Sequence, residues 1–440
     1  MASTVTAPEP INSIPLMRRP AVAKLLIIAL LAEIGYAVLN VSTMPVYLQG
    51  ERKFGASALG YVLVAFLLCE AVFKSPMGHF ADRFGPKKLM MLGPLISVAT
   101  SLFSLMIPST GGKPLEILAF ICLRACDGLG AAMLWPAAFS AVGETVEDGE
   151  RQQAMSLLNL CYMLGIAFAF PLGGAINDLS GTKWAGLVLA AGMFAAVGIA
   201  VWRFVPNSVP KKKVEDASTS HSELATFAKS ARQIPTYLLL ATVTFAGVGF
   251  PMAIFKIFPL DQFHFSETMV GLLVCPGAIA MGIASVPVSR FGERIGRARA
   301  VHIGLAACSI GLWLIAVGAF VPVLRNPWIF MICGVPCGIG FLLAIPAWMA
   351  SVSDIDPDCR GANLGAIMTA QGLGAIIGAP IGSAMYEKLQ PIGLQIGLGQ
   401  SFGRYSPFVA CAIFVTFGMA LSMRILRDPD KHLNLPAEVS

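Results

Sequence analysis

Long apolar segments recur along the whole chain and constrain its fold more than any other feature. Each is long enough for an α-helix to cross the hydrocarbon core of a bilayer, which takes about 20 residues. They lie at residues 21–48, 56–81, 88–108, 114–140, 151–178, 183–205, 235–262, 267–289, 299–323, 327–352, 360–387 and 402–426. With 56% hydrophobic and 13% charged residues, the chain has too few polar groups to cover a soluble domain. The sequence therefore predicts an all-α membrane protein with twelve transmembrane helices.

The placement of Lys and Arg predicts the orientation in the membrane. If the chain begins in the cytoplasm, most of its 31 Lys and Arg residues lie in cytoplasmic segments, as the positive-inside rule requires. Both termini are then expected on the cytoplasmic side of a cell membrane, either a bacterial inner membrane or a plasma membrane. The net charge of +6 follows from this asymmetry, so no nucleic-acid partner is expected. The first apolar segment is too long for a cleaved signal and contains Glu33, which favours a retained span.

The second half of the chain repeats the first. The segment Gly78–Lys88 returns 211 residues later as Ser289–Arg299, and the match continues with small slips through the following spans. Matching positions include Gly60/Gly271, Arg83/Arg294, Gly85/Gly296, Gly93/Gly304, Gly130/Gly340, Pro171/Pro380 and Asp178/Glu387. Six spans per half make this a parallel repeat, which predicts two six-helix bundles related by an axis along the membrane normal.

The repeat also predicts the organisation of the chain. We expect a cytoplasmic tail (1–20), an N-terminal bundle (21–205), a cytoplasmic linker (206–233), a C-terminal bundle (234–426) and a second tail (427–440). The linker contains three consecutive lysines, so it is either a plain connection or a patch for anionic lipid headgroups. Prolines flanked by glycines predict helix bends at the interface between the halves. These residues are Gly165, Pro171, Gly173, Gly174, Pro380 and Gly382.

The motif between the second and third spans resembles the signature of the major facilitator superfamily of secondary transporters. It matches at Gly78, Asp82, Arg83, Gly85, Lys87 and Lys88. Arg124, Asp127, Gly128 and Gly130 resemble the fourth-span motif of the family, and Gly165–Gly174 resembles its drug/proton antiporter motif, with Phe170 at a position where the family has Gly. The resemblance covers about residues 20–426 and implies alternating access by two bundles.

The resemblance also implies a gate at the cytoplasmic face. Asp82 is expected near the N-terminal end of the eleventh span, close to Arg360, when the halves close on this side. The predicted gate comprises Gly78, Asp82, Arg83, Gly85, Lys88 and Arg360. The alternative is that the basic residues only anchor the topology of the chain.

Six ionisable residues fall inside the predicted spans, where each needs a partner or a water-filled cavity. They are Glu33, Glu70, Lys74, Arg124, Asp127 and Lys256. Glu70 and Lys74 lie four residues apart, so they form either a neutralising pair or a gate pair at the interface. Glu33 and Asp127, with Arg124 as modulator, are the expected proton-coupling residues, because a membrane carboxylate can titrate near neutral pH.

The cavity-lining spans implied by the family add further candidates. The expected substrate cavity comprises Glu33, Asn40, Arg124, Asp127, Trp135 and Lys256. For Lys256 the alternative is snorkelling toward the membrane surface. For Arg124 and Asp127 the alternative is that the two residues, three apart, only pair with each other.

The predicted function is proton-coupled export of a small amphipathic drug-like compound or metabolite. Uptake of an organic anion or nutrient, with Arg124 and Lys256 as countercharges, is the first alternative, and a membrane-embedded lipid-handling protein is the second. The sequence shows no nucleophile–base constellation and no metal-ligand cluster, so we expect no enzyme activity, no metal and no cofactor other than the coupling proton. The expected partners are membrane lipid and a small-molecule substrate, and the expected state is a monomer.

Overall fold

The structure of the protein is a computed structural model that describes residues 16–147, 150–206, 232, 234–353, 355 and 360–426. The first half contains η1 (Leu16–Arg18), α1 (Pro20–Ala37), the π-helical segment η2 (Val38–Thr43), α2 (Met44–Gly50), α3 (Ala56–Phe84), α4 (Pro86–Met106), α5 (Pro114–Thr145), α6 (Arg151–Ser180) and α7 (Ala185–Phe204). The second contains α9 (Pro235–Met252), α10 (Ile257–Phe263), α11 (Glu267–Ile295), α12 (Arg297–Ala316), η4 (Val317–Ala319), η5 (Pro322–Leu324), α13 (Pro327–Ser353), α14 (Arg360–Gln395) and α15 (Ser401–Ile425). The predicted linker and both tails lie largely outside the described residues.

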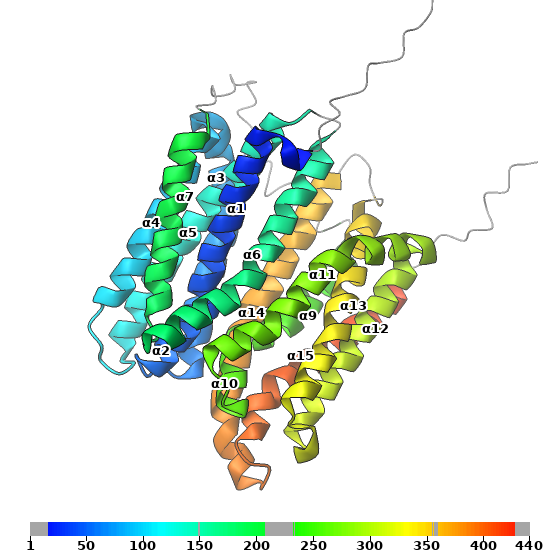
Figure 1. Ribbon diagram of the computed structural model, residues 1–440. Coiled ribbons are helices and arrows are strands. Elements are labelled where there is room, and N and C mark those ends of the chain that lie inside the picture. Colours follow the sequence, from blue (N-terminus) through cyan, green and yellow to red (C-terminus); the bar gives the residue numbers. More distant parts are fainter. Residues whose placement is uncertain are drawn as a thin grey trace, which may run out of the picture.

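These helices confirm the predicted fold class. Within the described residues, eleven helices are long and apolar enough to cross a membrane, with α1, η2 and α2 forming one continuous span. The 29-residue helix α11 is not among these eleven and occupies the place of the predicted eighth span. Figure 1 shows α1–α7 in one bundle and α9–α15 in the other. The seventh span is interrupted, because α9 ends at Met252 and α10 begins at Ile257.

The alternation of the helices gives the molecule two faces. The terminal face carries Leu16, Gly85 and Leu426, and the distal face carries the connections at residues 51–55, 181–184 and 264–266. The terminal face is the one that the positive charges predict to be cytoplasmic. On this face Arg19 donates two hydrogen bonds of 2.6 Å to Glu150, and they lower the pKa of that carboxyl because they favour its ionised form.

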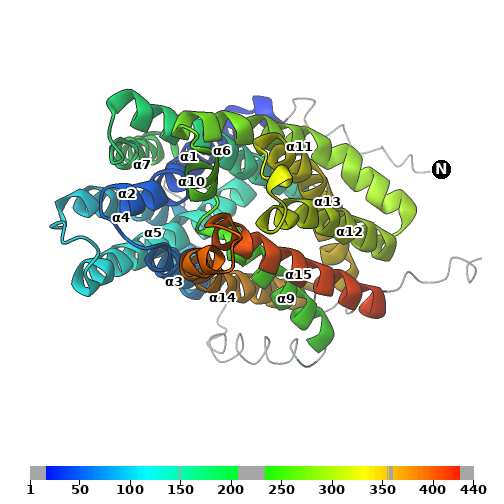
Figure 2. The ribbon, with the colours of Figure 1, turned by 90° about the horizontal axis from the view of Figure 1, so that it is seen from below.

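The two halves meet along two helix pairs. Figure 2 shows α6 beside α11 at one edge of the boundary and α3 beside α14 at the other. In each pair a glycine of one half faces a proline of the other: a Cβ on Gly271 would overlap the backbone of Pro171, and a Cβ on Gly60 would overlap that of Pro380. The same glycine–proline contact therefore occurs in both helix pairs, at positions that the repeat relates. The small glycine lets the two helix backbones approach closely.

Gly85 and Gly296 adopt the same unusual backbone conformation in the two halves. Their φ and ψ angles are 87° and 140° for Gly85 and 97° and 148° for Gly296. Residues with a Cβ rarely adopt this region. The predicted spans leave residues 82–87 as the connection here, but α3 continues to Phe84 and α4 begins at Pro86. A single glycine makes the reversal because only its backbone can turn that sharply.

We therefore expect Gly85→Ala and Gly296→Ala each to destabilise the protein by about 1–3 kcal/mol, the cost of a strained backbone. The measurement is thermal unfolding in detergent. Gly192→Ala is the matched control, because a Cβ at this position in α7 meets open space and a helical Gly→Ala change is neutral or mildly stabilising. Equal effects at all three positions would contradict the conformational argument.

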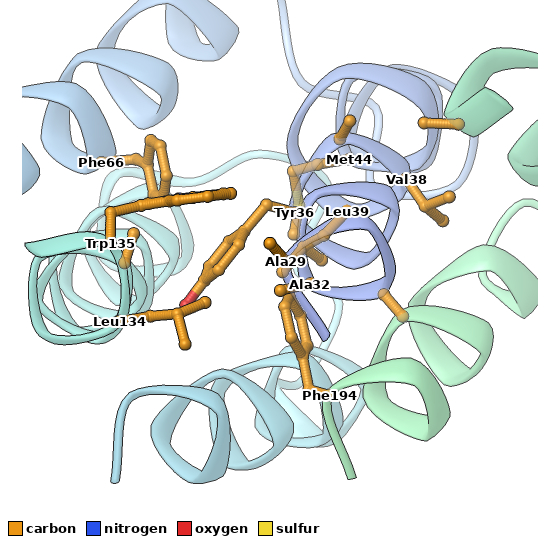
Figure 3. Packing of buried hydrophobic residues seen from close by; sticks show 14 of the residues in the cluster. Ala29, Ala32, Tyr36, Val38, Leu39, Met44, Phe66, Leu134, Trp135 and Phe194 are labelled. Carbon is orange, nitrogen blue, oxygen red and sulfur yellow. The ribbon is translucent and has the colours of Figure 1, made fainter. Parts of the chain in front are cut away.

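The core of the first bundle fixes the helix that carries the predicted site. Tyr36 of α1 points among Phe66, Trp135 and Phe194 (Figure 3), and its ring centroid lies 4.6 Å from that of Phe194. Its hydroxyl lies 3.1 Å from the Ser97 hydroxyl of α4, which donates a hydrogen bond to it. Buried hydroxyls need such partners, so α1 is held at a defined rotation.

Candidate functional site

Lys256 lies in the break between α9 and α10 and crosses to the other half of the molecule. Its ammonium group donates to the Ser42 carbonyl at 2.6 Å and lies 2.9 Å from the Ser42 hydroxyl. It also pairs with Glu267 of α11 at 2.7 Å, and both side chains are 0% exposed. Glu267 belongs to the same half as Lys256, so this ion pair supplies the partner that a buried charge needs. The Ser42 contacts cross the boundary and exist only while the two halves are together on the distal face.

Glu267 is the centre of this contact. Besides Lys256, it accepts hydrogen bonds from Asn177 of α6 at 3.0 Å and from Lys183 at 2.9 Å. Asn177 and Lys183 belong to the first half, whereas Glu267 belongs to the second. We call Ser42, Asn177, Lys183, Lys256 and Glu267 the distal lock.

Two further contacts on the distal face are related by the repeat. Asp178 at the end of α6 accepts a 2.8 Å hydrogen bond from the backbone N–H of Thr268 at the start of α11. Glu387 in α14 accepts a 2.8 Å bond from the backbone N–H of Ser57 at the start of α3. Each carboxylate satisfies an N–H that its helix cannot pair internally. The halves are thus joined symmetrically at both edges of the distal face.

A second buried charge cluster lies within the first half. Arg124 and Asp127 of α5 pair at 3.0 Å, with side chains 1% and 0% exposed. The Arg124 guanidinium also donates to Asn40 at 3.2 Å, and Thr100 donates to Asp127 at 3.3 Å. The Asn40 amide lies 3.4 Å from Asp127 and 3.1 Å from the carbonyl of Tyr36. We call Asn40, Thr100, Arg124 and Asp127 the charge cluster.

The charge cluster has unused hydrogen-bonding capacity. Among the described residues, none accepts a hydrogen bond from Nε or Nη2 of Arg124, although both atoms are buried. Unpaired buried donors are costly, so this guanidinium is suited to a further polar or anionic ligand. Glu33 lies buried in α1 and makes no hydrogen bond or ion pair with the described residues. A Cβ on Gly165 of α6 would overlap its side chain, so this glycine makes room for Glu33.

The other predicted site residues occupy varied environments. Lys74 donates to Glu70 at 3.0 Å along α3, with side chains 50% and 20% exposed. Trp135 is packed in the first bundle core against Tyr162. Arg83 is exposed at the terminal face.

The remaining gate residues are described only in part, and the remaining bend residues lie in helix–helix contacts. Lys88 is exposed, and the side chains of Asp82 and Arg360 lie outside the described part of the structure. A Cβ on Gly173, Gly174 or Gly382 would overlap, respectively, Ser42, Glu267 or Phe250, so these glycines permit close helix contacts. Gly78 meets Pro136 at an ordinary distance.

An apolar cavity of about 460 Å³ lies in the second bundle, between α9–α10, α11 and α13. The described residues that line it include no charged side chain. Its aromatic and methionine residues include Phe255, Phe263, Met281, Phe330, Met331 and Phe408. Phe255 also stacks edge-on with Phe170 of the first bundle at 6.0 Å, so the cavity borders the boundary between the halves.

Sequence reasoning did not identify Glu267, Asn177 or Ser42. Glu267 is the first residue of an apolar segment, where an acid is typical of an ordinary helix start. Its inter-half partners lie far away in sequence, at a separation of 90 residues for Asn177. One signal was available: Ser57/Thr268 and Asp178/Glu387 fall at matching positions of the repeat.

A duplicated bundle of membrane-spanning helices with buried charges at and near the boundary of its halves defines a membrane transport protein. The sequence profile of the Major Facilitator Superfamily matches residues 25–260 and 237–439. The chain belongs to this family, as the motif at Gly78–Lys88 indicated, and it is therefore a multi-pass transporter and not an enzyme.

Among similar proteins is Multidrug resistance protein 2 of Bacillus subtilis, 25% identical over 382 residues, which cover 83% of this chain and 89% of that protein. The class C tetracycline resistance protein of Escherichia coli is 26% identical over 344 residues, covering 75% of this chain and 80% of that one. The crystal structure of the nucleoside transporter NupG has the same fold, with a TM-score of 0.70, 14% identity, and coverage of 92% of this chain and 98% of that one.

Proposed function

We propose that the protein exports small amphipathic drug-like compounds or metabolites across the cell membrane by proton-coupled alternating access, with both termini in the cytoplasm. The observation that carries this proposal is the distal lock. Lys256 and Glu267 of the second half form a fully buried pair that contacts Ser42, Asn177 and Lys183 of the first half, so opening the distal face breaks these contacts and hydrates the pair. A charge pair that is dry in one state and wet in the other is a gate contact for a rocking two-bundle carrier.

The substrate class is inferred from the apolar cavity and from the named relatives. Aromatic and methionine side chains line the cavity, and none of its described lining residues is charged. Met side chains adapt to ligands of different shapes. Two relatives are named for multidrug and tetracycline resistance. Both features support an apolar or aromatic substrate body.

Glu33 and Asp127 are the proposed proton carriers, with Arg124 as the modulator of Asp127. Both acids are buried in the first bundle, and carboxyl groups are among the side chains that take up and release protons in proteins. Asp127 has an adjacent cation, whereas Glu33 has none in hydrogen-bonding contact among the described residues.

Replacing Glu33 by Gln or Asp127 by Asn is expected to abolish proton-driven transport while substrate counterflow remains measurable, because the neutral amide binds no transported proton. The assay uses proteoliposomes with an imposed proton gradient and a panel of substrates of different charge. Glu150→Gln is the control, a carboxylate at the terminal face paired with Arg19. Full gradient-driven transport by both amide variants would refute the proton assignment.

The unused donors of Arg124 support a second candidate, transport of an organic anion. Nε and Nη2 of this guanidinium are buried and have no acceptor among the described residues, which suits it to bind a carboxylate. The same substrate panel separates the two candidates: gradient-driven flux of anionic compounds only, lost in Arg124→Lys, would favour the anion.

A further inference from the structure

The π-helical segment η2 connects the charge cluster to the distal lock. It carries Asn40, which contacts Arg124 and Asp127, and Ser42, which contacts Lys256. The two residues are separated only by Val41. One rigid turn of backbone therefore touches the predicted proton and substrate site on one side and the inter-half gate on the other.

The local sequence explains why this turn is not an ordinary α-helix. Pro45, in the first turn of α2, has no N–H to donate to the carbonyl of Val41, and its ring would clash with that carbonyl. The backbone widens instead, and the N–H of Met44 pairs with the carbonyl of Leu39 five residues earlier. Single π-helical turns of this kind occur frequently at functional sites.

We propose that η2 couples the two sites, so that neutralising or occupying Asp127 releases the distal lock. Asp127 and Arg124 hold the Asn40 amide through contacts of 3.4 and 3.2 Å. When a proton or a cationic substrate group neutralises Asp127, the contact with Asn40 loses its charge-assisted character. η2 then shifts and moves the Ser42 carbonyl and hydroxyl away from Lys256, which favours opening of the distal face.

This coupling makes Asn40 and Ser42 positioning residues: they act on the gate through Lys256. It rests on the proposed function only for the identity of what neutralises Asp127. The opening itself requires neither substrate nor a proton gradient, so it is measurable in the purified protein.

The test compares the effect of Asp127→Asn on the distal face in several backgrounds. Spin labels at Leu179→Cys and Val323→Cys, 86% and 84% exposed in different halves, report the distance between the halves by pulsed double resonance in lipid nanodiscs, after replacement of the native cysteines. In the parent, Asp127→Asn is expected to raise the ratio of distal-open to distal-closed protein by about fivefold or more, the lower end of typical allosteric coupling.

The background variants separate coupling from a merely structural effect. Asn40→Leu keeps the side-chain volume but removes the contact, and in this background the response to Asp127→Asn is expected to fall below about twofold, because uncoupled sites are nearly additive. Thr43→Val is the matched control: it lies buried in η2, and its hydroxyl has no hydrogen-bond partner among the described residues, so the full response is expected there.

An unchanged response in Asn40→Leu, or no response in the parent, would overturn the coupling. If Asn40→Leu does not fold, Asn40→Ala provides the same comparison. If the parent protein showed no proton-coupled transport, the proposed function would be contradicted, but the distance measurements would still test the coupling. If proton-coupled transport were normal and the effects of Asp127→Asn and Asn40→Leu on the distance between the halves were additive, η2 would not be the connection, and the proposed function would stand.

Discussion

Glu267→Gln is expected to open the distal face of the protein. The substitution leaves the Lys256 ammonium buried without its countercharge, with only the Ser42 carbonyl and hydroxyl and a neutral amide nearby. Removing one partner of a buried ion pair costs about 3–5 kcal/mol. The cost falls on the closed state, because Lys256 is hydrated when the halves separate. Since about 1.4 kcal/mol is a factor of ten, the open-to-closed ratio is expected to rise more than about 100-fold.

The Leu179 and Val323 spin labels measure this shift as growth of a longer-distance population. Lys183→Met is the matched control within the same lock. Lys183 also pairs with Glu267, but its side chain is 41% exposed, and exposed pairs contribute at most about 1 kcal/mol. We therefore expect a distance distribution close to the parent for Lys183→Met. If Glu267→Gln gave the same distribution as Lys183→Met, the buried charge of Glu267 would not be what favours the closed distal face.

Arg124→Met is expected to lower the free energy of unfolding by about 3–5 kcal/mol, again because one member of a buried pair loses its partner. Asp127 would remain 0% exposed with only the amide of Asn40 and the hydroxyl of Thr100 as donors. The measurement is denaturant-induced unfolding in detergent. Lys74→Met is the control, because its pair with Glu70 lies on one helix with the lysine half-exposed, and its removal is expected to cost less than about 1 kcal/mol.

The double variant Arg124→Met/Asp127→Leu tests the physical cause. Replacing both charges of a buried pair by apolar groups is often neutral for stability, so stability is expected to return toward the parent value. Proton-driven transport is expected to remain absent, since the predicted proton carrier is gone. A double variant as unstable as Arg124→Met would show that packing around Arg124, and not an unpaired charge, determines the loss.

Much of the fold was predictable because membrane insertion imposes local rules. Apolar length predicted the spans, and the Gly and Pro positions of the repeat predicted the two bundles. The repeat even indicated where the halves meet, since Gly60/Gly271 and Pro171/Pro380 form the close contacts of α3 with α14 and of α6 with α11. Short-range pairs such as Glu70 with Lys74 and Arg124 with Asp127 also lie where helical spacing places them.

The partners of Lys256 could not be predicted in this way. Its contacts with Ser42 span 214 residues, and neither helical periodicity nor the repeat pairs these two positions. The break between α9 and α10 and the π-helical turn before α2 both change the rotation of the following residues, so counting along an ideal helix gives the wrong faces for Lys256 and Ser42.

The sequence by itself determined that this chain crosses the membrane as two related six-helix bundles, because hydrophobic length and backbone-limiting glycines and prolines act locally. Only the tertiary structure decided which charges face each other across the boundary. It places Lys183 against Glu267 and Lys256 against Ser42 across the distal face, and η2 connects Ser42 to the charge cluster around Asp127. Such pairings depend on how two bundles dock, and docking is set by the summed surface of many residues and not by any single segment.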